Sequence, residues 1–320
     1  MPTKYQRLSP EGIEYISIHD RESKVNVDLL GKVHRFDPAW AEAFLATVPP
    51  ILAGEDIREV VNGILAAKRA GKPIILTMGA HVIKVGLSPL IIEMMRRGFV
   101  THIGLNGAGV IHDTELALFG HTSEDVSATI NVGAFAVTKE TSEFINPAIK
   151  AGVADGIGVG EAVGKAIAES KPKHFEISVV GKAYELNVPL SVHIAIGTDF
   201  IHMHPNADGA AYGEGSLRDF YLIAKAVSGL QGGGVIWNVG SAVVLPVVIE
   251  KAIALCQNLG YSLGGFMGVN YDFIQHYRPN LNPVKRACEV GGKGISITGH
   301  HELMLPLTVA LLFAMEGLDG

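Results

Sequence analysis

PIILTMGAHVIKVGLSPLIIEMMRRGFVTHIGLNGAGVIHD, residues 73–113, is the stretch of sequence that decides the fold. Its apolar run at 74–78 predicts a buried parallel strand. Ser88 and Pro89 predict a helix start, with a hydroxyl at the N-cap and proline in the first turn. A second apolar run at 100–105 predicts the next strand. Ligands of such βαβ units bind beyond the carboxyl ends of the strands, so we expect a site in the loops at 79–86 and 106–114.

The rest of the chain continues this alternation of strands and helices. Four more strands are predicted at 188–196, 234–237, 262–269 and 294–298. Helices or helix starts are predicted at 37–48, 57–70, 114–119, 122–125, 137–151, 159–171, 216–228 and 303–316. A further helix is predicted to follow the turn at 238–241 and to end at 259. The pattern predicts an α/β fold: a Rossmann-like, doubly wound, mainly parallel sheet of about six or more strands, with helices on both faces. We expect a single domain at 61–320, with residues 1–60 as an N-terminal extension packed on it.

Composition narrows the class of protein. The 320 residues carry 26 basic and 32 acidic side chains, with no basic stripe, which argues against nucleic acid as a partner. Two cysteines, Cys256 and Cys288, exclude a framework of several disulfides. We see neither a signal peptide nor an apolar run of the roughly 20 residues that cross a bilayer, so we expect a soluble cytoplasmic protein. The mean hydropathy of +0.29 hints at surface buried between subunits or at a thick parallel-sheet core.

Small and polar residues follow the carboxyl ends of several predicted strands. They are Gly79, Ala80, His81, Asn106, Gly107, Ala108, Gly109, Asn238, Gly240, Ser241 and Asn270. At such strand ends small residues let a nucleotide approach the backbone, and amides supply hydrogen bonds. The same residue types are also ordinary turn formers. Their recurrence at several strand ends favours a nucleotide-type pocket.

The loop after the strand at 188–196 carries a second constellation. The spacing of its residues fits two interpretations, a metal site or loop histidines that hydrogen-bond or bind substrate; the residues are Asp199, His202 and His204. Further candidate metal ligands are His193, His300 and His301. We favour the interpretation without a metal.

Two other features have competing interpretations. Gly158, Gly160 and Gly164 come close to a dinucleotide fingerprint, but a predicted helix precedes them where the fingerprint needs a strand, which favours a helix–helix connection. Lys84, Lys285 and Lys293 lie in predicted loops, where a lysine beside a cofactor can react covalently. For Lys285 the simpler interpretation is a solvated charge.

The ordered series of these motifs resembles the deoxyhypusine synthase-like family. The matching segments are residues 73–113, then VPLSVHIAIGTDFIHMHP, GGGVIWNVGSAVVLPVVIEKA, VNYD and ELMLPLTVALLFA, within residues 60–318. The segment HDTELALFG also resembles the related ornithine cyclodeaminase domain of the LOR/SDH type. The resemblance implies NAD as cofactor and a homotetramer with sites near subunit interfaces. It further implies oxidation of an amine to an imine, followed by aminoalkyl transfer or cyclodeamination.

The resemblance also implies roles for particular residues. Residues 106–109 and 240–241 match the cofactor turns, and Asp199 matches an acidic residue that holds the amine. Lys285 is the nearest match to the covalent lysine, but the family's Trp-Gly-Lys context is absent. His112 stands where the family has an acidic residue, and Leu245-Pro246-Val247 replaces its Lys-His-His.

Our leading hypothesis is an NAD-dependent enzyme acting on a small amine, polyamine or amino acid. Lys285, His112 and His202 are the candidate catalytic residues, the histidines as proton carriers. Carboxylates that can hold a cationic substrate are Asp199, Asp113, Asp208 and Glu214. The alternatives are a metal-dependent hydrolase using Asp199, His202 and His204, and a nucleotide-binding protein on the same fold without catalysis.

Overall fold

The apolar run at 74–78 forms strand β2 (Ile74–Met78), and all five of its residues are buried. The computed structural model describes residues 7–124 and 138–316. Alternate β2 side chains point to opposite faces of the sheet, so Leu76 belongs to one apolar core and Ile75 to another. A strand buried on both faces is characteristic of a sheet covered by helices on both sides.

Six parallel strands form the sheet, as the sequence predicts. They are β2, β3 (His102–Asn106), β5 (Leu190–His193), β6 (Val235–Val239), β7 (Met267–Asp272) and β8 (Lys293–Thr298). Their spatial order is β5-β3-β2-β6-β7-β8. Counted along the chain, this is the 3-2-1-4-5-6 order of dinucleotide-binding folds, and the order reverses between β2 and β6. Register is continuous there: Thr77 lies opposite Asn238, and Asn238 opposite Asn270.

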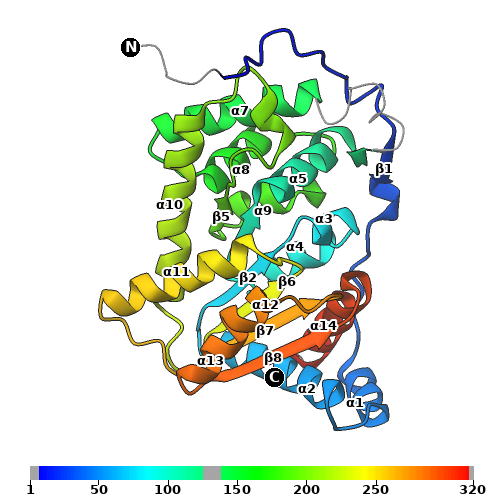
Figure 1. Ribbon diagram of the computed structural model, residues 1–320. Helices are drawn as coiled ribbons and strands as arrows, with labels where there is room; N and C mark the ends of the chain where they lie inside the picture. The colour runs from blue at the N-terminus through cyan, green and yellow to red at the C-terminus, as the bar shows by residue number, and fades with distance from the viewer. Residues whose placement is uncertain (1–6, 125–137, 317–320) are drawn as a thin grey trace.

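The helices pack on both faces of this sheet (Figure 1). The longer ones are α1 (Pro38–Thr47), α2 (Ala53–Arg69), α4 (Ser88–Arg96), α5 (Gly107–Phe119), α7 (Lys139–Ala154), α8 (Val159–Ser170), α9 (Val179–Glu185), α10 (Gly209–Val227), α11 (Val244–Asn258) and α14 (His301–Glu316). Short helices are α3 (His81–Lys84), α12 (Tyr277–Pro279) and α13 (Arg286–Glu289). The larger core contains residues of α2, α4, α5 and α14, and the smaller one residues of α10, α11 and α13.

Three predicted boundaries are wrong by several residues, and one helix was missed. Helix α5 begins at Gly107 instead of residue 114, because the Asn106 side chain caps it by accepting a hydrogen bond from the Gly109 N–H at 2.9 Å. Helix α10 begins at Gly209, where Asp208 is the N-cap, instead of at Ser216. The expected strand at 262–269 starts only at Met267. Helix α9 was not predicted.

The helix start expected at 122–125 is also wrong. Residues 121–124 form β4 (His121–Glu124), which pairs antiparallel with β1 (Ser23–Asn26); Asp125 lies outside the described residues. Thr122 does not cap a helix, because its hydroxyl donates to Glu115. The N-terminal segment runs along one side of the molecule from α7 towards α1 (Figure 1), and α2 continues unbroken through residue 60.

Candidate functional site

The point where the strand order reverses places the turns after β2 and β6 side by side. The Gly79 N–H donates to the Val239 carbonyl at 3.0 Å, and a side chain at Gly79 would overlap the Gly240 carbonyl. Gly240 itself has φ of +67°, the left-handed region that favours glycine. These two glycines therefore allow the two strand ends to meet, and the edge above them is where this fold binds ligands.

His301 lies beside this edge and is the functional candidate that the sequence indicated least clearly. It opens α14, is only 1% exposed, and its ring packs against Gly240. Among the described residues, neither ring nitrogen has a partner with good hydrogen-bond geometry, although Asp272 Oδ1 is 3.7 Å from Nε2 and the Tyr271 backbone also lies close to the ring. The rings of His81 and Phe273 lie 5.7 and 5.5 Å from that of His301, measured between centroids. Buried polar atoms without partners suit contact with a ligand.

Asn238 and Asn270 lie below this edge, inside the sheet. The Asn238 amide donates to Asn270 Oδ1 at 2.8 Å and to the Ser241 carbonyl at 3.0 Å, and it accepts from the Thr77 hydroxyl at 3.0 Å. Both asparagines are fully buried. Their side chains position the 240–241 turn and leave little capacity for direct contact with a cofactor.

A pocket of about 310 Å³ opens beside the first turns of α5. His112 and Asp199 both line it, so the structure brings together two of the predicted site residues from α5 and from the loop after β5. Ala108, Ile111, Phe200 and Met203 supply apolar walls. Its size is near the lower limit for small-molecule sites.

Electrostatics give the two titratable residues of this pocket, Asp199 and His112, different roles. Burial raises the pKa of Asp199 to about 6, so its carboxylate is ionised at neutral pH and favours a cation. Burial, with the positive charges of Lys84 and Arg21, lowers the pKa of His112 to about 3. His112 is therefore a neutral imidazole, whose Nδ1 lies 2.8 Å from the Thr122 hydroxyl.

The structure does not bring the other predicted catalytic and substrate-binding residues into this pocket, although Ala108, predicted as a cofactor contact, lines it. Asp113 is fully buried and accepts hydrogen bonds from the Ser178 hydroxyl and from two backbone N–H groups that open α9. Glu214 is exposed and pairs with Arg218 at 3.0 Å on α10. The Lys285 side chain is 66% exposed, and it follows residues that pack near the amino ends of β7 and β8.

His202 and His204 have local structural contacts. Nδ1 of His202 accepts from the backbone N–H groups of Gly197 and Asp199 at 3.1 and 3.3 Å, and its ring meets Tyr212 edge-on. His204 packs against Tyr15, with ring centroids 4.8 Å apart. Within the described ranges, no three His, Cys, Asp or Glu side chains are grouped to hold a metal ion.

The glycine-rich stretch at 158–164 is the start of α8: Gly158 is its N-cap, Gly160 and Gly164 lie inside the helix, and helix α7 precedes it where a dinucleotide fingerprint needs a strand. The Asp219 carboxylate lies against this helix start. Asp219 Oδ2 accepts from the Gly160 N–H at 2.9 Å and from the Val192 N–H at 2.7 Å. A protein carboxylate therefore occupies the place where a phosphate would meet the start of α8. A larger cavity of about 550 Å³ lies nearby, between α8, α9 and the amino end of β5, away from the residues with site chemistry.

Comparisons with known proteins were made at the levels of sequence and fold. No protein-family model matches the chain, and a search of curated proteins finds no significant relative. A conserved, provisionally assigned LOR/SDH protein from Methanococcus maripaludis S2 shares 16% identity over 92% of this chain and 73% of that one, with a TM-score of 0.50. AgrE, in a ternary complex with ornithine and NAD⁺, shares 15% identity over 90% of this chain, with a TM-score of 0.50.

These likenesses establish the fold alone. The chain spans only 35% of that AgrE chain. A provisionally assigned deoxyhypusine synthase from Entamoeba histolytica has 12% identity over 89% of this chain and 98% of that one, and its TM-score of 0.47 carries no argument. No helix in the described part of the chain is both long and apolar enough to cross a membrane.

Proposed function

We propose that this chain binds NAD at the carboxyl edge of the sheet, across β2 and β6, and acts on a small amine or amino acid held in the pocket of His112 and Asp199. The observation that carries the proposal is the strand order, which reverses between β2 and β6 as in dinucleotide-binding folds. The AgrE complex with ornithine and NAD⁺ has a comparable fold and supports this assignment.

The residues at this edge fit a dinucleotide. The turns at 79–81 and 240–241 would contact it through their backbone, and His301 offers two buried ring nitrogens without partners in the described chain. The first turn of α5 borders both the edge and the pocket because β3 is the neighbour of β2. When bound, NAD supplies an acceptor for the hydride of the carbon that bears nitrogen.

The chain's own residues would bind the amine and orient it. Asp199 pairs with the ammonium group when its carboxylate is ionised, above about pH 6. The neutral ring of His112, whose pKa of about 3 makes it a weak base, accepts a hydrogen bond from the N–H of the bound amine and orients it. No covalent lysine step forms part of the proposal, because Lys285 lies exposed and outside this pocket.

Calorimetric titration tests the proposal. We expect saturable NAD binding, and tighter NAD binding when L-ornithine or spermidine is present. The variant Asp199→Asn should retain NAD binding and lose the effect of the amine. The matched control Glu214→Gln removes an exposed carboxylate that does not line the pocket, and it should behave like the wild type.

Two outcomes contradict the proposal. Absence of NAD binding at millimolar concentration removes the cofactor. NAD binding that neither amine alters removes the amine chemistry, and it favours a nucleotide-binding protein without catalysis.

A further inference from the structure

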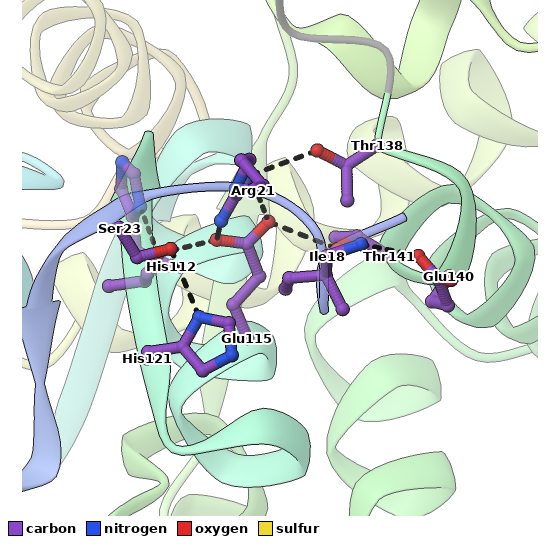
Figure 2. Close-up of polar contacts among 10 residues, drawn as sticks. Ile18, Arg21, Ser23, His112, Glu115, His121, Thr138, Glu140 and Thr141 are labelled. Atoms are coloured by element: carbon purple, nitrogen blue, oxygen red, sulfur yellow. Dashed lines mark hydrogen bonds and ion pairs between the residues drawn. The ribbon is translucent and has the colours of Figure 1, made fainter. Parts of the chain in front are cut away.

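Glu115 is a buried carboxylate of α5 whose two oxygens are fully engaged (Figure 2). Arg21 donates to Oε1 and Oε2 at 3.2 and 2.9 Å. Thr141 donates to Oε1 at 3.0 Å, and Thr122 donates to Oε2 at 2.6 Å. A carboxylate in an ion pair with a guanidinium can only accept hydrogen bonds, and all four bonds to Glu115 run from a donor to its oxygens.

The Thr122 hydroxyl connects this carboxylate to His112. A hydroxyl has a single hydrogen, and that of Thr122 points to Glu115. Towards His112 Nδ1, 2.8 Å away, the Thr122 oxygen can therefore only accept. Nδ1 must carry the hydrogen, and Nε2 of a neutral imidazole then carries a lone pair. Within the described residues, Nε2 has no hydrogen bond of its own, and His112 lines the pocket.

We propose that Glu115 and Thr122 are positioning residues that hold His112 in its Nδ1–H tautomer, so that Nε2 presents a lone pair to the N–H of a bound amine. The part concerning the amine rests on the proposed function. The two acceptors of the pocket, His112 Nε2 and the Asp199 carboxylate, then select a ligand that is a hydrogen-bond donor and a cation.

The N-terminal segment completes this arrangement. Glu140 accepts from the Ile18 N–H at 2.9 Å (Figure 2). It also accepts from the Ser17 hydroxyl at 2.7 Å, and the two bonds dock the segment at the start of α7. Pairing of β1 with β4 fixes it on the other side of Arg21 and also holds Thr122 in place. Residues 17–26 thus belong to the site, although they contribute no pocket-lining side chain.

Nuclear magnetic resonance of ring ¹⁵N-labelled histidine tests the tautomer in protein without ligand. The variant His112→Gln assigns the signal among the 13 histidines. We expect the Nδ1–H form in the wild type and in Thr122→Ser, and its loss in Thr122→Val. The matched control Thr141→Val removes a hydroxyl from the same carboxylate without touching His112, and it should keep the Nδ1–H form.

Finding the Nε2–H form in the wild type would overturn the inference, as would an unchanged Nδ1–H form in Thr122→Val. The tautomer found in the wild type can overturn the inference by itself, even if a variant does not fold. Because this measurement uses neither NAD nor amine, failure of NAD binding leaves it intact, and the two proposals fail separately.

Binding of spermidine or L-ornithine at saturating NAD gives the functional readout. We expect Thr122→Val to weaken amine binding about tenfold, as for loss of a hydrogen bond to a charged group, with NAD affinity unchanged. Thr141→Val should leave both affinities at wild-type values. Equal weakening in the two variants would show a purely structural role and would contradict the inference.

Discussion

Replacing Gly107 with alanine should separate folding from amine binding. Gly107 is the first residue of α5, and a side chain there would overlap Asp199 Oδ2 and come within 3.1 Å of Asp199 Cγ. Its φ is not in the left-handed region, so alanine adds no backbone strain. The added methyl group therefore acts mainly by displacing the Asp199 carboxylate.

The size of the effect follows from this contact. Asp199 Oδ2 must move by about 1 Å to restore van der Waals separation. The obstructing atom is the end of a side chain that can rotate, so the cost in stability should be about 1 kcal/mol or less, below that of overpacking in a rigid core. A displaced carboxylate loses its hydrogen bond to the ammonium group, worth about 1.5–3 kcal/mol, so amine affinity should fall by about ten- to a hundredfold.

The assay is calorimetric titration of spermidine or L-ornithine at saturating NAD, with thermal unfolding to monitor the fold. Gly109→Ala is the matched control in the same turn. The atoms nearest to a side chain at Gly109 would belong to Asn106 and Leu105, at 3.3 Å, and not to Asp199. We expect Gly107→Ala to weaken amine binding by about ten- to a hundredfold while keeping NAD binding, and Gly109→Ala to keep both at wild-type values. Wild-type amine affinity in Gly107→Ala would refute the assignment of Asp199.

Three further predictions follow from the same geometry. Because the pKa of Asp199 is raised to about 6, amine affinity should increase as pH rises through about 6 and then level off, whereas Asp199→Asn should show no such step in a calorimetric pH series. Glu115→Ala should lower the free energy of unfolding by about 3–5 kcal/mol in urea denaturation, because it leaves the Arg21 charge buried and unpaired. The double variant Arg21→Met with Glu115→Leu should lower that free energy by less, and equal losses would contradict this account of the pair. Lys285→Ala should leave NAD and amine affinities unchanged, since the side chain is 66% exposed outside the pocket, and a loss of either affinity would count against the site as placed.

The sheet was predictable because its signals are local. A continuous apolar run such as 74–78 is buried on both faces, and turn residues mark where it stops. Helices that separate consecutive strands act as crossover connections, so all six strands run parallel and the sheet is doubly wound. The boundaries were less predictable, because a cap such as Asn106 can end a strand and open a helix at once, which leaves no room for the expected loop.

The site was predictable only in part, because its decisive contacts join distant segments. The position of His112 in the sequence does not show that Thr122 orients its ring, or that Arg21 neutralises the carboxylate behind it. Asn238 looked like a cofactor contact, yet its hydrogen bonds run along the strand register to neighbouring side chains. His301 was one of several candidate metal ligands, and only its burial without partners indicates a ligand at this edge.

A crystal structure of the protein with NAD and L-ornithine tests the central claim most directly. The account predicts NAD density over the turns at 79–81 and 240–241, within hydrogen-bonding distance of His301, and amine density between His112 and Asp199. Density for NAD elsewhere would contradict the account, above all in the cavity of about 550 Å³ at the amino end of β5.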